Sequence, residues 1–217
     1  MVEYSNFPAR VSRIPRVGDA FRIDLESVIE LQPDLVIAWK SGNPPSALQK
    51  LQQLGIKVWQ LEITSPSEIA DAVENIARAA GTENEGKLIA RKLRSRLIKL
   101  QQDHADKTPV AFFYQVAARP LYTVNGQHII SRSLEICSGQ NIFSDQPALA
   151  PQISRESVIN ADPQIKFAPE YAGETPALQA WQEWPRLQAV EGGRLFYLPA
   201  DEISQATPRL FDSIELA

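Results

Sequence analysis

The sequence predicts an α/β protein of two similar lobes with mostly parallel sheets, joined by one long rigid helix. Strand-like apolar runs alternate with helical patterns along the 217 residues, and this alternation is typical of parallel βα units. A short phrase occurs once in each half of the chain, and the longest amphipathic pattern lies between the two copies. We therefore expect an N-terminal lobe over 1–84, a connecting helix over 85–106 and a C-terminal lobe over 107–217.

The repeated phrase covers residues 24–38 and 154–168, which align without a gap and are identical at six of fifteen positions. In each copy a capping residue, Asp24 or Ser154, precedes a short helical pattern, and a proline and an apolar run follow. Each copy therefore predicts a capped helix followed by a strand, with chance recurrence as the alternative interpretation. The identical pairs are Glu26 and Glu156, Ser27 and Ser157, Val28 and Val158, Ile29 and Ile159, Pro33 and Pro163, Ala38 and Ala168.

Two strands and a helix follow the first copy of the phrase. The apolar run 35–39 predicts a buried strand, and the run 58–61 predicts a second one. Between them, residues 44–54 predict a helix that ends before Gly55, because glycine favours the left-handed conformation that closes helices. The predicted apolar face of this helix consists of Leu48, Leu51 and Leu54.

The next helix begins with a recognisable start signal. Ser65 and Glu68 fit the S-x-x-E capping box, and Pro66 suits the first helical position. Apolar residues then keep helical spacing until Gly81, which predicts the end of the helix. These residues are Ile69, Ala72, Val73, Ile76 and Ala80.

The longest helical pattern begins at Glu85 and reaches about His104. Its other faces carry arginine and lysine, so a helix that lies on a membrane or a nucleic acid is one interpretation. A solvated helix packed through a single apolar stripe is the interpretation we favour, because charge runs on helices are common. The predicted stripe is Ile89, Leu93, Leu97 and Leu100.

The C-terminal lobe is predicted from three strands and two helices. The apolar runs 110–114, 165–168 and 195–198 predict the strands. Residues 131–137 predict a short helix closed by Gly139, and the second copy of the phrase supplies the other helix.

Composition excludes several classes of protein. About 44% apolar residues is ordinary for a globular protein, and a net charge of −4 argues against a binder of nucleic acids or anionic membranes. No apolar stretch reaches the ~18–20 residues of a membrane span. No signal peptide is visible after Met1, and the single Cys137 leaves the redox compartment undefined.

Enzyme motifs and metal-binding patterns are missing from the sequence. It contains no G-x-S-x-G, no Walker loop and no G-x-G-x-x-G. His128 lies near Ser131 and Ser133, but a catalytic triad needs convergence in space. The two histidines, His104 and His128, are too few and too far apart for a zinc or manganese site. We therefore expect a non-enzymatic binding protein with no metal and no required cofactor.

Candidate ligand-binding residues follow two of the predicted strands. Ligands of open α/β sheets bind beyond the carboxyl ends of the strands, where Trp39, Glu170 and Tyr171 stand. Glu26 and Glu156 instead begin their helices, where the helix dipole favours a carboxylate. The dipole alone explains either acid, but a matched pair, one on each lobe, also suits a partner with two cationic sockets.

The sequence resembles a known family, the vitamin B12-binding proteins of bacterial cobalamin ABC importers. The resemblance runs from Tyr4 to Leu210. It implies the class III, chelatase-like fold of periplasmic binding proteins, in which one long helix joins two lobes, and a periplasmic location. The phrases that carry it are YSNFP, DLESVIELQPDLVIAWKSGN, LQQLGIKVW, SLEICSGQNIF, PQISRESV and ATPRL.

The resemblance implies cobalamin or a related corrinoid as ligand and the permease of an inner-membrane ABC importer as partner. Flat aromatic faces suit a large ring ligand with polar edges. Glu26 and Glu156 match the family's two acids that bind permease arginines. No nucleic-acid partner is expected. The expected ligand-binding residues are Tyr4, Phe21, Trp39, Tyr122, Tyr171 and Arg209.

A siderophore-binding or haem-binding protein of the same fold is the alternative. Such a protein favours an anion-binding cleft, for which Arg119 or Arg209 could supply the positive charge. A module that binds no small ligand also remains open if both ends of the chain are incomplete.

Several positions depart from the family pattern. Ala20 and Ala150 stand where relatives often carry tryptophan. Phe21 either replaces the first of these missing rings from the next position or is a core residue. The ligand could therefore be a cobalamin variant or a precursor such as cobinamide. Lys166 lies inside a strand that should be buried, which an edge position or a side chain that reaches the surface would explain.

Both ends of the chain look short beside the family. The first strand and helix of the first lobe are expected to be missing, and the final helix is expected to be cut. Cys137 would then lack the cysteine that its counterpart in relatives pairs with, or it is a buried free thiol. An uncovered sheet edge also predicts a dimer or marginal stability.

Overall fold

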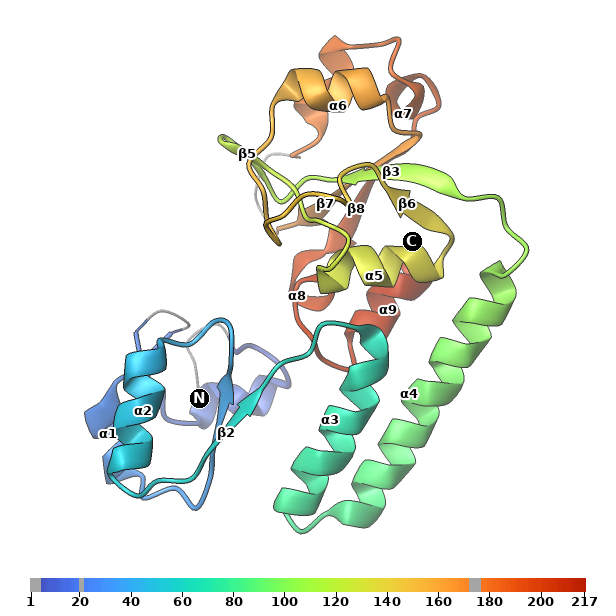
Figure 1. Cartoon of the computed structure of the whole chain (residues 1–217). Helices are drawn as coiled ribbons and strands as arrows, with labels where there is room; N and C mark the ends of the chain where they lie inside the picture. Colours follow the sequence, from blue (N-terminus) through green and yellow to red (C-terminus); the bar gives the residue numbers. More distant parts are fainter. Residues whose placement is uncertain (1–4, 20–21, 172–176) are drawn as a thin grey trace. The chain divides into compact units, whose positions relative to one another are not determined.

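The computed structural model describes residues 5–19, 22–171 and 177–217 (Figure 1). Contacts within the chain divide it into two compact units, 1–62 and 63–217. The predicted lobe boundaries at residues 84 and 106 stay a prediction.

The first unit holds a two-stranded parallel sheet, in which Val36 pairs with Val58 and Trp39 with Leu61. Helix α2 buries Leu48 and Leu51, as predicted, but Leu54 follows the helix and is 55% exposed, so that part of the prediction is wrong. The described elements are η1 (Ala9–Arg13), α1 (Leu25–Glu30), β1 (Val36–Trp39), α2 (Pro45–Gln53) and β2 (Val58–Leu61).

The second unit is built on a four-stranded parallel sheet with the order β6-β3-β7-β8, and β4 and β5 form a separate antiparallel hairpin. This confirms the α/β class with parallel sheets. Its described elements are α3 (Pro66–Ala79), α4 (Glu83–His104), β3 (Val110–Tyr114), β4 (Ala117–Ala118), β5 (Leu121–Tyr122), α5 (Ile129–Ile136), β6 (Gly139–Asn141), α6 (Arg155–Ala161), β7 (Ile165–Glu170), η2 (Gln179–Glu183), α7 (Gln188–Glu191), β8 (Leu195–Pro199), α8 (Ala200–Ile203) and α9 (Leu210–Leu216).

Helices cover both faces of this sheet. Figure 1 shows α5, α8 and α9 on one side and α6 and α7 on the other. Because strand side chains alternate between faces, β3 places Phe112 and Tyr114 in one core cluster and Phe113 in the other. The sheet is therefore buried on both faces, which explains why its strands read as continuous apolar runs.

Helices α3 and α4 lie side by side and antiparallel (Figure 1). Helix α4 packs through one stripe, which confirms the packed-helix interpretation over a surface-binding one. Ile89, predicted in the stripe, is 44% exposed, because the buried row runs one position further along. The buried residues of α4 are Gly86, Ala90, Leu93, Leu97 and Leu100.

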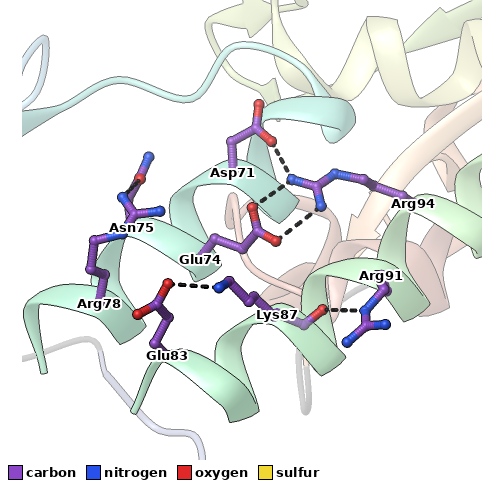
Figure 2. A network of polar contacts seen from close by, with 8 residues as sticks. All are labelled: Asp71, Glu74, Asn75, Arg78, Glu83, Lys87, Arg91 and Arg94. Carbon is purple, nitrogen blue, oxygen red and sulfur yellow. Dashed lines mark hydrogen bonds and ion pairs between the residues drawn. The ribbon is translucent and has the colours of Figure 1, made fainter. Parts of the chain in front are cut away.

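Charged side chains join α3 to α4 (Figure 2). The Arg94 guanidinium lies 2.6 Å from Asp71 and 3.0 Å from Glu74, and Lys87 lies 2.8 Å from Glu83 along α4. The hydrogen bonds that the guanidinium donates to Glu74 and Asp71 raise the pKa of Arg94. Part of the positive charge that the sequence places on α4 is therefore neutralised within the helix pair. None of the helices in the described part of the chain is long and apolar enough to cross a membrane.

The ends of α3 and α5 differ in detail from the predictions. Ser65 makes no side-chain cap, and Glu68 accepts a hydrogen bond from the Thr64 backbone N–H at 2.7 Å, so the predicted capping box is not formed. Helix α5 begins two residues earlier than predicted, at Ile129, because His128 caps it. Gly139 does not close this helix but begins β6.

The repeated phrase forms the same local structure in both copies. The side chains of Asp24 and Ser154 cap α1 and α6 by accepting from the backbone N–H three residues later. Val28 and Val158 are buried. A left-handed residue then precedes each proline, Gln32 with φ 46° and Asp162 with φ 43°. The prediction of a capped helix followed by a strand is therefore confirmed for both copies.

Lys166 lies in β7, an inner strand between β3 and β8, and its side chain is buried. Both explanations offered from the sequence, an edge position and a side chain that reaches the surface, are therefore wrong. Instead, Nζ lies 4.0 Å from the ring centroid of Trp181 and 5.2 Å from that of Phe113.

Candidate functional site

The carboxyl ends of the parallel strands are where α/β sheets bind ligands. In the first unit these ends are Trp39 of β1 and Leu61 of β2, which pair in register. The pairing continues one step further, because the Lys40 N–H donates to the Leu61 carbonyl at 3.0 Å. Trp39 is 54% exposed at this edge, so it presents a large aromatic surface, as its candidate role requires.

A tight turn after β1 fixes the backbone of Trp39. The Trp39 N–H donates to the Asn43 side-chain oxygen at 2.7 Å, and the Asn43 N–H donates back to the Trp39 carbonyl at 2.9 Å. The indole N–H donates to Glu62 Oε1 at 3.3 Å, and the Ser41 hydroxyl donates to the same oxygen at 2.9 Å. The exposed indole is therefore held by its neighbours.

In the second unit, Tyr122 lies on the hairpin that follows β3. Its carbonyl accepts a hydrogen bond from the Val116 N–H at 2.9 Å, and its backbone also pairs with Gln152. The Thr123 hydroxyl donates to the Tyr114 carbonyl at 2.8 Å, at the last residue of β3. These bonds hold the half-buried Tyr122 near the carboxyl end of β3.

Tyr171 directly follows β7 and is 50% exposed. Strand β7 runs parallel to β3, so Tyr171 and the hairpin that carries Tyr122 stand at the same edge of the sheet. Tyr114 ends β3 at this edge, and burial raises the pKa of its hydroxyl, with the nearby Tyr171 adding to the effect. The position after a strand thus predicted Tyr171 at this edge, and the family resemblance, not the strand pattern, pointed to Tyr122.

Arg209 precedes α9 and forms an ion pair with Glu202 at 2.8 Å. The Ser213 hydroxyl also donates to Glu202, at 3.4 Å. Glu202 follows β8 in α8, so this pair belongs to the same end of the sheet. The Glu202 carboxylate reduces the capacity of Arg209 to attract an anionic ligand, and this ion pair was not predicted from the sequence.

Arg119 lies exposed in the turn of the β4–β5 hairpin. Among the described residues no carboxylate forms an ion pair with it. Together with Arg155 and Glu183 it lines an open pocket of about 470 Å³. Of the two arginines proposed for an anionic ligand, Arg119 is therefore the more available.

The two acids of the repeated phrase are exposed in the first turns of their helices, Glu26 in α1 and Glu156 in α6. Hydrogen bonds from its own backbone N–H and from the Ser154 hydroxyl lower the pKa of Glu156. Neither carboxylate is buried, and both are accessible to a partner.

Some predicted positions have no described structure. Tyr4 and Phe21 lie outside the described residues, as does Ala20. The residues that sequence reasoning missed are Glu62, Ser41 and Gly42, which surround Trp39. Glu62 could have been noticed because it directly follows a predicted strand.

The histidine and serines considered for catalysis have structural partners. His128 Nδ1 accepts from the Ile130 N–H at 3.2 Å, and burial lowers the pKa of this histidine. Ser133 donates to the Ile129 carbonyl at 2.7 Å, and Ser131 accepts from Asn141 at 2.6 Å. Within the described residues, no group of three His, Cys, Asp or Glu is arranged to hold a metal ion.

Cys137 is a free, partly buried thiol in the structure. Its Sγ lies 3.4 Å from the Ile214 carbonyl oxygen, which accepts its hydrogen bond. Burial raises the pKa of this thiol, so the thiolate form that reacts is disfavoured.

Comparison with known proteins gives the family. A model for periplasmic binding proteins matches residues 2–202. The vitamin B12-binding protein of Vibrio cholerae serotype O1 is 35% identical over 214 residues, covering 98% of this chain and 77% of that protein. The crystal structure of the periplasmic vitamin B12 binding protein of Vibrio cholerae has a TM-score of 0.89 at 35% identity, covering 99% of this chain and 84% of that chain.

A more distant structure shares the fold alone. The periplasmic heme binding protein of Vibrio cholerae has a TM-score of 0.82 at 18% identity, over 98% of this chain and 85% of that chain. The family match covers most of the chain, and the relatives' similarity extends over nearly all of it. The chain therefore belongs to the periplasmic binding protein family, a family of binding proteins rather than enzymes, and within it resembles the vitamin B12-binding proteins.

Proposed function

We propose that this protein is the substrate-binding component of an ABC importer, which captures cobalamin or a related corrinoid and delivers it to the membrane permease. The observation that carries the proposal is the 35% identity to a vitamin B12-binding protein over 98% of the chain. The geometry supports it, because Trp39, the last residue of β1, and Tyr171, directly after β7, are exposed aromatic residues at the carboxyl ends of their strands. Such rings suit a broad, partly apolar ligand with polar edges.

Titration with cyanocobalamin tests this proposal directly. Saturable quenching of tryptophan fluorescence is expected, because the corrin ring would lie against Trp39 and its near-ultraviolet absorption overlaps tryptophan emission. Trp39→Ala should weaken binding about tenfold or more, as expected for loss of a stacking face. Trp59→Phe is the matched control, because Trp59 lies within β2 rather than at the exposed edge. No fluorescence change at high micromolar cyanocobalamin would contradict the proposal.

We also propose that Glu26 and Glu156 bind cationic side chains of the permease, one from each unit. Both are exposed and occupy equivalent places in the repeated phrase. Charge pairs of this kind orient an encounter as much as they strengthen it. A symmetric transporter would give a reason for the repetition of the phrase.

The double variant Glu26→Ala with Glu156→Ala should stop the protein from stimulating ATP hydrolysis by the reconstituted importer. Its affinity for cyanocobalamin should stay within twofold of the original, because neither acid is proposed to touch the ligand. Glu30→Ala with Glu191→Ala removes two other exposed acids, one from each unit, and serves as the control. Unchanged stimulation by the Glu26 and Glu156 variant would show that these acids do not dock the protein.

A siderophore or haem is the second candidate ligand, and Arg119 is the observation that favours it. This exposed guanidinium has no ion-pair partner among the described residues and lines a pocket with Arg155. The same titration, repeated with haem and a ferric siderophore, decides between the candidates. Tighter binding of either anion than of cyanocobalamin would support the second candidate.

A further inference from the structure

We propose that Glu62, Ser41 and Gly42 form a holder that fixes the indole of Trp39 in the orientation that stacks on the ligand. This inference rests on the proposed function, since it assigns positioning residues to the same site. All four residues belong to the first unit. None of the three holder residues was expected from the sequence to act at the site.

Gly42 supports one face of the indole. A Cβ at residue 42 would lie 1.9 Å from Cε3, 2.2 Å from Cζ3 and 2.3 Å from Cδ2 of Trp39. Three neighbouring ring atoms at such similar distances place this Cβ above the plane of the ring rather than at its edge. The Gly42 backbone therefore packs flat against the six-membered ring, and any side chain there would displace the indole.

Glu62 fixes the direction in which the indole N–H of Trp39 points within the plane of the ring. Its Oε1 accepts from the indole N–H at 3.3 Å and from the Ser41 hydroxyl at 2.9 Å. Glu62 directly follows Leu61, whose backbone pairs with Trp39 in the parallel ladder. The Glu62 carboxylate therefore follows the strand that pairs with the Trp39 strand. The Ser41 hydroxyl holds this carboxylate in place.

The holder leaves one broad face of Trp39 for stacking. One face is covered by Gly42 and the N–H edge is occupied by Glu62, while the residue as a whole is still 54% exposed. A ring that is already oriented loses less side-chain freedom when a ligand stacks on it. Loss of the holder should therefore weaken binding about 3- to 10-fold, even though Trp39 itself is still present.

A double-mutant cycle tests whether the holder acts through Trp39. Glu62→Ala should weaken cyanocobalamin binding about 3- to 10-fold, and by no more than twofold when Trp39→Ala is already present. Gly42→Ala should weaken binding as much as Trp39→Ala does. Glu62→Gln keeps a side-chain oxygen acceptor and should restore most of the affinity. Asp34→Ala, which removes another exposed acid of this unit, should have no effect.

A measurement without ligand separates failure of the holder from failure of the proposed function. The near-UV circular dichroism of Trp39 is the difference between the spectra of the protein and its Trp39→Phe variant. This difference should be lost in Gly42→Ala and reduced in Glu62→Ala, while the far-UV spectra stay unchanged. A Trp39 signal that survives both substitutions would overturn the proposal. An equal loss of affinity from Glu62→Ala with and without Trp39 would overturn it as well.

Discussion

At the scale of single residues, Lys166 is the least expected feature of the core. Its ammonium group is buried between Trp181 and Phe113, and Nζ has no hydrogen-bond acceptor among the described residues. Burial lowers the pKa of Lys166 from 10.5 to about 8. The attraction of a cation to the face of an indole offsets part of the cost of burying the charge. The core therefore retains a charge that destabilises the folded state.

Lys166→Met should raise the free energy of unfolding by about 1–3 kcal/mol at pH 7, because each unit of pKa shift corresponds to about 1.36 kcal/mol. Below pH 8 both the folded and the unfolded states carry the proton, and the full cost of burial is present. Between about pH 8 and 10.5 the unfolded state binds more protons, so the stability of the original protein rises with pH. The advantage of the methionine variant should shrink over the same range.

Chemical denaturation followed by the fluorescence of Trp181 and Trp184 measures this difference. Lys107→Met is the control, because Lys107 is exposed in the same unit. A methionine variant that is less stable at pH 7, or whose advantage does not change with pH, would show that another interaction offsets the cost of burying the Lys166 charge.

At the scale of elements, the contact between α3 and α4 depends on Gly86. A Cβ at this position would lie 2.2 Å from the Cβ of Ala77, so the two helices approach more closely than a pair of methyl groups allows. Arg94 joins the same helices through Asp71 and Glu74 (Figure 2). That ion pair is partly exposed and contributes little to stability, so close packing decides the geometry of the pair.

Gly86→Ala should lower the free energy of unfolding by about 1–2 kcal/mol, because the overpacking outweighs the gain of up to about 1 kcal/mol in helix propensity. Adding Ala77→Gly moves the methyl group from one helix to the other and should restore most of the loss. Thermal unfolding of both variants measures the effect. A Gly86→Ala variant as stable as the original protein, or more stable, would contradict the claim that overpacking outweighs the gain in helix propensity.

Elements whose causes are local were predictable from sequence. Asp24 and Ser154 cap their helices as predicted, because an N-cap depends on the next three residues. The burial of Lys166 was not predictable, because it depends on Trp181, which is brought near by the fold. The same reason applies to Glu62, since its bond to Trp39 spans 23 positions in the sequence. Strand β6 was missed because three residues, Gly139–Asn141, give no periodic pattern.

At the scale of the whole molecule, the same arrangement occurs in both units. A capped helix leads through a left-handed residue and a proline to a parallel strand, and an aromatic residue stands at or just beyond the strand's carboxyl end. Trp39 is that residue in the first unit and Tyr171 in the second. The family, the fold class and these edge positions were accessible from sequence. The relative placement of the proposed ligand-binding side chains depends on tertiary packing and was not.

Equilibrium dialysis against cyanocobalamin is the most direct test of the central claim, that these edge aromatics serve a corrinoid. We expect one bound cyanocobalamin per chain, tighter binding than for haem or a ferric siderophore, and an affinity about tenfold or more lower in Trp39→Ala. Equal concentrations of cyanocobalamin on both sides of the dialysis membrane, with folded protein on one side, would contradict this claim.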